Sequence, residues 1–461
     1  MFIREQAWIR LATFIEAITV VTSIFVTISL FQIIDRNVLD LKFSLLALPW
    51  IIIFYIFLSR AFDIHVYYNR TVKGDILNSF FVQLFFLSGL SLVGLPFLDS
   101  FSFSVVSFII ILAIGTFLSS LVHLIIFKIY ESKVNRKRLL IVGKEAEVLA
   151  AWKNFQASSE PLHKVTHLVV NHYLESIRKV VDEIDAVYIA GDIESKTRLA
   201  IYDYLISQDK ILFLTTNVEN SIAINAQLFN VSDESMIQLS PYCLSVGQGF
   251  VKRTLDFLMA GLLLLLSSPI FVLTAILIKL ESPGPIFYRQ DRVTKENRVF
   301  SILKFRSMRE DAERTSGPVL AHANDNRVTR IGKFIRRSRI DELPQLLNVL
   351  KGDMSMVGPR PERPFFVEQF IQENNYYSLR HNVPAGITGY AQVYGKYTSD
   401  FQSKLKFDLL YIKQYSILLD VKLLLKTFVI LLDKTSSRGK SEENDKETNL
   451  EKLAETIKIL T

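Results

Sequence analysis

Long apolar runs in the first third of the 461-residue chain are the feature that most restricts its fold. Four such runs lie at residues 11–34, 43–58, 76–98 and 103–127. Each is near the ~20 residues that an α-helix needs to cross a bilayer, although the third contains Asn78 and Gln83. Because a spanning helix satisfies its own backbone hydrogen bonds, the runs predict a four-helix transmembrane domain over residues 1–130. The alternative is a buried helical bundle in a soluble protein.

The distribution of Lys and Arg predicts the orientation of these helices. Basic residues follow the second and the fourth runs: Arg60, Arg70, Lys73, Lys128, Lys133, Arg136, Lys137 and Arg138. The loop between the third and fourth runs has no Lys or Arg. Cytoplasmic loops carry the excess of basic residues, so both ends of the domain are predicted to lie in the cytoplasm. These loops and contact with anionic membrane lipid account for the net charge of +7, and no nucleic-acid partner is expected.

Residues 131–245 have the alternating pattern of a small α/β domain. Apolar strand-like segments are followed by helix-like segments several times, which predicts parallel βαβ units and a Rossmann-like sheet. The first turn keeps Gly143 of the three glycines in a dinucleotide-binding fingerprint. It also places Glu145 and Glu147 where a phosphate would have to lie. The domain is therefore predicted to be degenerate, with a structural or regulatory role and with no nucleotide or a weakly bound one.

A fifth apolar run covers residues 257–280, within a predicted membrane helix 252–280. Its middle contains Ser268 and Pro269, and proline removes a helix hydrogen bond and bends the helix. Basic residues lie at both ends, and a complete fifth crossing would place the rest of the chain outside the cell, where nucleotide sugars are absent. These observations predict a re-entrant helix, broken at Ser268 and Pro269, that enters and leaves on the cytoplasmic face. An ordinary kinked span is the alternative.

Two adjacent acids, Asp341 and Glu342, are the candidate chemical centre. Leucines at helical spacing follow them, Pro344 fits a first helical turn, and Gly352 is a typical helix stop. The acids are therefore predicted at or just inside a helix N-terminus, where the helix dipole favours anions. Neighbouring helical residues point about 100° apart, so separate roles are expected, with one attacking and the other binding a divalent ion. The alternative is that the acids only cap the helix.

Four arginines surround this pair in the sequence: Arg306, Arg336, Arg337 and Arg360. Arginine binds phosphate oxygens bidentately and neutralises developing charge, so the pattern indicates phosphate chemistry. Arg360 lies between Pro359 and Pro361, which would fix its backbone in one place. Pairing of arginines with acids on an ordinary surface is the alternative.

Residues 251–427 resemble the bacterial sugar transferase family, the monotopic polyprenyl-phosphate phosphoglycosyl transferases. The resemblance rests on Ser268-Pro269 and on four segments in family order: residues 304–308, 341–345, 357–362 and 384–393. The whole chain is similar to the long members, such as undecaprenyl-phosphate glucose or galactose phosphotransferases. The resemblance implies an α+β membrane protein. Its parts would be the four-helix transmembrane domain 1–130, the Rossmann-like domain 131–245, a mainly helical catalytic domain 246–433 and a flexible tail 434–461.

The resemblance also implies residue roles. Asp341 would be the nucleophile that forms a covalent phosphosugar and releases UMP, and Glu342 would help bind Mg²⁺. Phosphates and substrate would be contacted by Lys304, Arg306, Arg336, Arg337, Arg360 and Gln392. The implied reaction transfers a hexose-1-phosphate from a UDP-sugar to undecaprenyl phosphate. It would take place at the cytoplasmic face of the bacterial inner membrane, as the first membrane step of capsular or exopolysaccharide synthesis, and a homodimer is expected.

Two other functions stay open at this point. One is a membrane scaffold for polysaccharide assembly in which the last third is only a binding surface. The other is a conventional glycosyltransferase that moves the sugar without its phosphate and releases UDP. The identity of the released nucleotide separates the second from the phosphotransferase.

Overall fold

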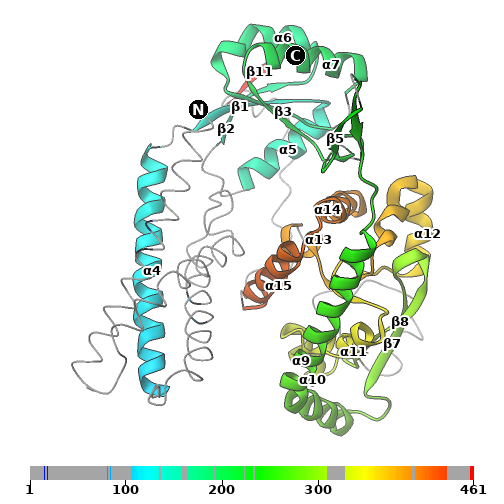
Figure 1. The fold of residues 1–461 in the computed structure, drawn as a ribbon. Helices are drawn as coiled ribbons and strands as arrows, with labels where there is room; N and C mark the ends of the chain where they lie inside the picture. Colours follow the sequence, from blue (N-terminus) through cyan, green and yellow to red (C-terminus); the bar gives the residue numbers. More distant parts are fainter. Residues whose placement is uncertain are drawn as a thin grey trace. The chain divides into compact units, whose positions relative to one another are not determined.

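The computed structural model describes ten segments of the chain and the four isolated residues 15, 18, 80 and 84 (Figure 1). The segments are residues 105–133, 136–157, 163–191, 193–216, 218–222, 224–231, 234–308, 328–395, 400–432 and 457–460. The predicted spans at 11–34, 43–58 and 76–98 lie outside the described residues, apart from those isolated positions. Two compact units are present: residues 1–215 with 444–461, and residues 216–443.

A five-stranded parallel sheet forms the core of the first unit. Its strands are β1 (Lys137–Val142), β2 (His163–Val169), β3 (Ala186–Ile189), β4 (Ile211–Leu214) and β11 (Lys458–Leu460). They lie in the order β11-β2-β1-β3-β4, and every neighbouring pair is parallel. This confirms the predicted parallel α/β sheet. The edge next to β2 is formed by residues 457–460, at the far end of the segment predicted as a flexible tail.

Helices cover both faces of this sheet. Helix α5 (Glu145–Ala157) packs on the face that contains Leu139 and Ile141. Helices α6 (Tyr173–Val180) and α7 (Ser195–Ser207) pack on the face that contains Leu140 and Val142, and η2 (Val181–Glu183) follows α6 (Figure 1). A strand covered on both faces has apolar residues at consecutive positions, which explains why β1 reads as a continuous apolar run.

Near the turn after β1, the Glu147 carboxylate lies against Gly191, where a residue with a side chain would clash with it. Gly191, with φ of 75°, lies so close to Glu147 that an added Cβ would be 2.0 Å from the Glu147 carboxyl carbon. The backbone N–H of Lys144 donates to Glu147 Oε2 at 3.4 Å. The acid predicted to lie at the phosphate position therefore occupies the carboxyl edge of the sheet, beside the β3 end.

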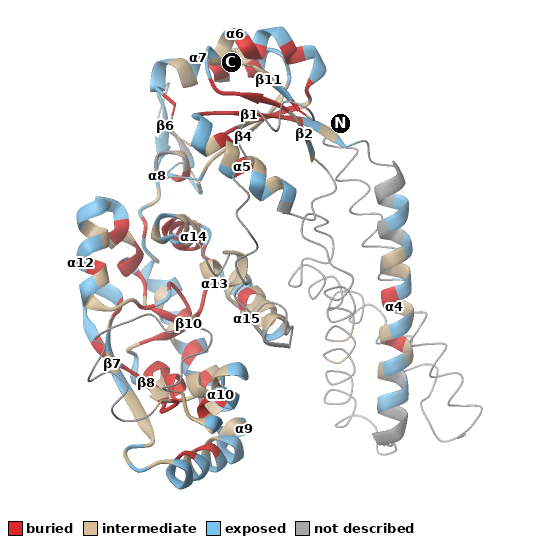
Figure 2. Cartoon of the chain, turned by 180° about the vertical axis from the view of Figure 1, so that it is seen from behind, coloured by how far each residue is buried: buried red, intermediate tan, exposed pale blue. Residues whose placement is uncertain are grey.

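Two long apolar helices are described. Helix α4 (Val105–Lys133) has 29 residues and coincides with the fourth predicted span. Helix α9 (Val246–Glu281) has 36 residues, and among the described residues it is the one helix long and apolar enough to cross a membrane. Most of its apolar side chains face outward in the second unit, with Leu265 71% and Leu266 67% exposed (Figure 2). Exposed apolar surfaces of this kind mark contact sites for a membrane, a protein partner or a ligand.

Ser268 and Pro269 lie inside α9, which is assigned as one helix from Val246 to Glu281. The structure thus assigns one helix across the predicted break, and this helix changes direction along its length (Figure 1). Pro269 has no N–H with which to bond the Leu265 carbonyl. The Ser268 hydroxyl donates to that carbonyl instead, at 2.7 Å. This replacement bond lets the helix continue past the proline.

The second unit is mainly helical, as predicted, with short sheets. Its strands are β5 (Gln227–Val231), β6 (Glu234–Gln238), β7 (Phe287–Val293), β8 (Val299–Phe305), β9 (Ser355–Val357) and β10 (Gly386–Thr388). Its helices after α9 are α10 (Arg330–Arg337), α11 (Gln345–Lys351), α12 (Pro364–Glu373), α13 (Tyr390–Tyr394), α14 (Phe401–Lys413) and α15 (Ile417–Leu432), and α8 (Val218–Ser221) precedes them. The short 3₁₀ segments are η3 (Lys295–Asn297), η4 (Ile340–Glu342) and η5 (Asn375–Asn382). One apolar core joins α9, β7, β8, α11, α14 and α15.

Polar contacts fix the start of α9 within this unit. Lys252 is 3% exposed and lies 2.6 Å from Asp420 of α15. Arg253 donates to the last carbonyls of α11, including Leu350 O at 2.8 Å, which would otherwise lack partners. From the sequence, these two residues were interpreted as the basic residues that flank a membrane helix. Their side chains are instead committed to internal contacts.

Candidate active site

Asp341 and Glu342 lie in η4, a single 3₁₀ turn between α10 and α11. The sequence placed them at the start of the leucine-rich helix, but that helix begins at Gln345. Pro344 cannot donate a backbone hydrogen bond, so the chain around it makes shorter-range bonds, such as Leu343 N to Ile340 O at 3.1 Å. The two acids therefore precede α11 in a turn of their own.

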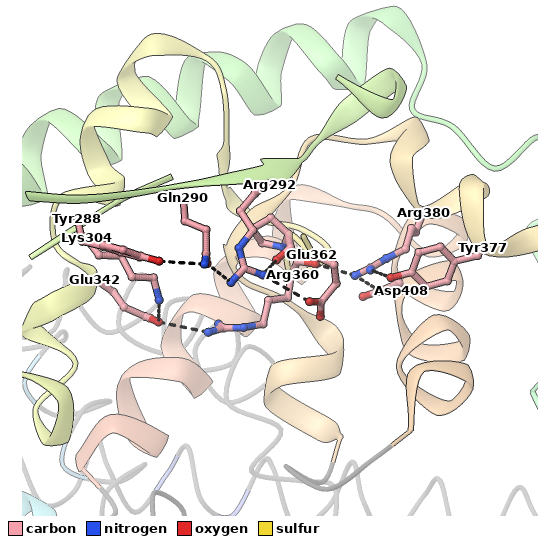
Figure 3. Close-up of polar contacts among 11 residues, drawn as sticks. Tyr288, Gln290, Arg292, Lys304, Glu342, Arg360, Glu362, Tyr377, Arg380 and Asp408 are labelled. Atoms are coloured by element: carbon pink, nitrogen blue, oxygen red, sulfur yellow. Dashed lines mark hydrogen bonds and ion pairs between the residues drawn. The ribbon is translucent and has the colours of Figure 1, made fainter. Parts of the chain in front are cut away.

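Three basic side chains surround the Glu342 carboxylate, which is 14% exposed, and Figure 3 shows two of them, Lys304 and Arg360. Its Oε1 lies 3.2 Å from Lys304 Nζ, 3.3 Å from Arg360 Nη2 and 3.9 Å from Arg339 Nη1. Burial raises the pKa of Glu342, but Arg360, Lys304 and Arg339 outweigh burial and hold that pKa at about 2. Glu342 is therefore a permanent anion in a basic surrounding.

Asp341 has the opposite environment. Within the described part of the chain it makes no hydrogen bond and no ion pair, and it is partly exposed. Burial, followed by the negative charge of Glu342, raises the pKa of Asp341 to about 6. Neighbouring acids whose environments separate their pKa values are suited to different tasks. The two carboxylates thus differ in their electrostatic environments.

Lys304 reaches the site from the β7–β8 hairpin, where it pairs with Tyr288. Residues alternate faces along a strand, so Tyr288, Gln290 and Arg292 of β7 share one face. Gln290 Nε2 donates to the Tyr288 hydroxyl at 3.0 Å, and Arg292 Nη2 donates to Gln290 Oε1 at 2.7 Å (Figure 3). Arg292 Nη1 also lies 3.5 Å from Glu362 Oε2. This row of polar side chains on β7 was not predicted from the sequence, although polar residues at every second position were a signal for it.

Arg360 comes from the loop that joins β9 to α12. The backbone before it passes very close to β10, since a Cβ on Gly358 would be 2.3 Å from the Pro384 carbonyl oxygen. Only glycine allows this approach. The Arg360 side chain is 45% exposed and extends to Glu342. The structure therefore brings Lys304 and Arg360 to the Glu342 carboxylate, which is adjacent in sequence to Asp341.

The other predicted phosphate ligands lie differently. Arg306 is 7% exposed and donates to the carbonyl and the hydroxyl of Ser282 at 2.7 and 2.8 Å, so it anchors the end of α9 and does not contact the acids. Arg336 donates to Ser307 Oγ at 2.8 Å, and its positive charge partly opposes the rise in the pKa of Asp341 that burial and Glu342 cause. Arg337 is exposed. Gln392 has a buried Oε1 without a hydrogen-bond partner.

Comparison with known proteins places the chain in a family. Residues 247–434 match the family model for bacterial sugar transferase. A UDP-glucose:undecaprenyl-phosphate glucose-1-phosphate transferase of Caulobacter vibrioides is 43% identical over 190 residues, which are 39% of this chain and 69% of that protein. The chain belongs to the bacterial sugar transferase family.

Two further members of the bacterial sugar transferase family show how far the similarity extends. A UDP-N-acetylgalactosamine-undecaprenyl-phosphate N-acetylgalactosaminephosphotransferase of Aeromonas hydrophila is 50% identical over 186 residues, 40% of this chain and 44% of that protein. A UDP-glucose:undecaprenyl-phosphate glucose-1-phosphate transferase of Escherichia coli K12 is 34% identical over 270 residues, 56% of this chain and 58% of that protein. The matches thus span about half the length of these two curated relatives.

Proposed function

We propose that this protein transfers a hexose-1-phosphate from a UDP-sugar to undecaprenyl phosphate and releases UMP. The observation that carries the proposal is the Glu342 carboxylate among Lys304, Arg339 and Arg360, directly beside the unpaired carboxylate of Asp341. A basic group of this kind suits a diphosphate substrate, because fixed positive charges stabilise developing negative charge. The printed names of the relatives describe the same class of reaction with glucose or N-acetylgalactosamine.

In the proposed mechanism, Asp341 attacks the phosphorus attached to the sugar. A bond forms between a carboxylate oxygen and that phosphorus, and the bond from the phosphorus to the bridging oxygen breaks, so UMP leaves with that oxygen. A phosphate oxygen of undecaprenyl phosphate then attacks the same phosphorus and releases Asp341. The product is a lipid diphosphate sugar. Dividing the transfer into two steps is the usual advantage of a covalent intermediate.

Mg²⁺ is the proposed cofactor. Proteins usually hold this ion with one or two carboxylates together with substrate phosphates and water. Glu342 supplies one such carboxylate, whereas no group of three or more His, Cys, Asp or Glu side chains within the described segments forms a protein-only site. Glu342 would hold the ion, which would neutralise phosphate charge during transfer. Lys304 and Arg360 are placed to contact the phosphates of the same substrate.

The membrane arrangement is also proposed. The apolar side chains of α9 would lie in the bilayer of a bacterial inner membrane, and the bend of α9 would return the helix to the cytoplasmic face. The site would then lie where a soluble nucleotide sugar and a lipid phosphate can meet. Four spanning helices before residue 130 would also bring the chain back to the cytoplasmic side before the catalytic unit begins. This topology keeps the catalytic unit in the compartment that contains UDP-sugars.

The decisive experiment measures the released nucleotide for the purified full-length protein with undecaprenyl phosphate and a panel of UDP-sugars. Continued UMP release over many turnovers that requires the lipid, with at most one UMP per protein without it, and loss of all release in Asp341→Asn support the proposal. Release of UDP would show a conventional glycosyltransferase. Release of neither nucleotide with any sugar, while the protein binds polysaccharide-assembly partners, would favour the scaffold.

A further inference from the structure

The loop that carries Arg360 is held at four consecutive carbonyl groups. Pro359 O accepts from Gly386 N at 2.9 Å, and Arg360 O accepts from Arg380 Nη2 at 2.8 Å. Pro361 O accepts from Arg292 Nη1 at 3.0 Å, and Glu362 O accepts from Val293 N at 2.9 Å. The donors come from three parts of the unit: β10, the η5 segment with Arg380, and the end of β7 with Arg292 and Val293. The backbone on both sides of Arg360 therefore has little freedom to shift.

Arg380 is the least expected of these donors, because its charge is buried. Its side chain is 5% exposed and lies 2.8 Å from Asp408 Oδ2, and the Asp408 side chain is 2% exposed. Another guanidinium nitrogen donates to the Tyr377 hydroxyl (Figure 3). Burying an ion pair is costly, and apolar side chains of similar volume often stabilise a protein at least as well. Stability alone is therefore a weak reason for this arrangement.

We propose that Arg380, held by Asp408, is a positioning residue that fixes the Arg360 backbone so that the Arg360 side chain reaches the substrate phosphates. Arg380 reaches the reacting atoms only through Arg360. The inference rests on the proposed function, because it needs Arg360 to contact phosphate. A misplacement of about 1 Å at such a contact can lower a reaction rate by ~10²-fold.

A double-mutant cycle tests this pathway in the full-length protein. Arg380→Lys keeps a positive charge but cannot contact Arg360 O, Asp408 and Tyr377 together. We expect it to lower kcat for UMP release by about 10- to 100-fold in the wild-type background. In an Arg360→Ala background, Arg380→Lys should have almost no additional effect, because the side chain that Arg380 positions is already absent. Arg298→Ala, which removes an exposed arginine paired with Asp353, is the matched control and should leave kcat unchanged.

A multiplicative loss, in which Arg380→Lys is equally harmful with and without Arg360, would overturn the inference. So would full activity of Arg380→Lys. If that variant does not fold, Asp408→Asn is used in the same cycle, since it keeps the shape of the side chain and leaves the arginine in place. The parallel Asp341→Asn measurement keeps the two proposals apart: retained activity there contradicts the proposed function, whatever the cycle gives.

Discussion

Lys304 Nζ lies 3.2 Å from Glu342 Oε1, so the β7–β8 hairpin and the turn before α11 meet at one ion pair. Neither residue is fully accessible, with the two side chains 23% and 14% exposed. The same carboxylate oxygen is shared with Arg360 from a third segment. One acid therefore links three segments of the catalytic unit: the β7–β8 hairpin, the turn before α11 and the loop that carries Arg360.

Replacing this acid should affect catalysis strongly. Glu342→Gln keeps the shape of the side chain but removes the negative charge that Lys304, Arg339 and Arg360 share. We expect kcat for UMP release to fall by ~10²-fold, because the basic groups and the proposed metal ligand are no longer organised for transfer. Asp353→Asn, at a surface ion pair with Arg298, is the control and should have no such effect. Wild-type activity in Glu342→Gln would contradict the assigned role.

Ser268 should stabilise α9 more than Ser267 does. The Ser268 hydroxyl bonds the Leu265 carbonyl at 2.7 Å, whereas the Ser267 hydroxyl lies 3.5 Å from the Leu264 carbonyl. Ser268→Ala leaves the Leu265 carbonyl unpaired, so we expect the free energy of unfolding to drop by about 1 kcal/mol. Ser267→Ala should cost less than half of that. Denaturant unfolding in detergent measures both, and equal losses would show that the bond does not compensate for Pro269.

The two ends of α9 should lie on the same side of the membrane. Cys243 is exposed just before the helix, and Leu280, near its end, is 78% exposed. In intact cells a membrane-impermeant maleimide should label neither Cys243 nor Leu280→Cys in a Cys243→Ser background. After the cells are opened, it should label both. Labelling of only one of the two positions in intact cells would show a full crossing and would exclude the re-entrant helix.

His381 should make stability fall in acid. Burial, followed by the positive charge of Arg380, lowers the pKa of His381 to about 3, and the free side chain has a pKa of about 6.5. Between these values the unfolded chain binds more protons, so the folded state loses stability as the pH falls from about 6.5 toward 3. This single group contributes a slope of up to ~1.4 kcal/mol per pH unit.

His381→Gln removes that titration and can keep a contact with Asn297, whose Oδ1 lies 2.6 Å from His381 Nδ1. We expect unfolding curves between pH 5 and 7 to show a smaller pH slope for the variant than for the wild type. His163→Gln, in the other unit, is the comparison that should leave the slope of the catalytic unit unchanged. Identical slopes for His381→Gln and the wild type would contradict the burial-driven pKa shift.

The fold of the α/β unit was largely predictable, because each strand is a contiguous apolar segment such as residues 139–142. Strand β11 was not, because three residues after a long polar segment give no periodic pattern. In the site, Lys304 and Arg360 were found through their motifs. Arg292 and Arg380 were missed, because the acids that they pair with, Glu362 and Asp408, are distant in sequence and their charge reads as ordinary surface. Lys252 was misread for the same reason: only the fold reveals Asp420 beside it.

The pairing of β11 with β2 also affects the order in which the chain can be assembled. Strand β2 gains its outer neighbour only when residues 458–460 have been synthesised, after the whole catalytic unit. At roughly 5–20 residues per second, the ribosome needs tens of seconds for that interval. During this time β2 presents unpaired backbone groups, which are a hazard for wrong pairing between nascent chains. The sheet whose first strands are synthesised before the catalytic unit therefore receives its last strand after that unit. Pairing of β11 with β2 occurs only in chains that have been synthesised through β11.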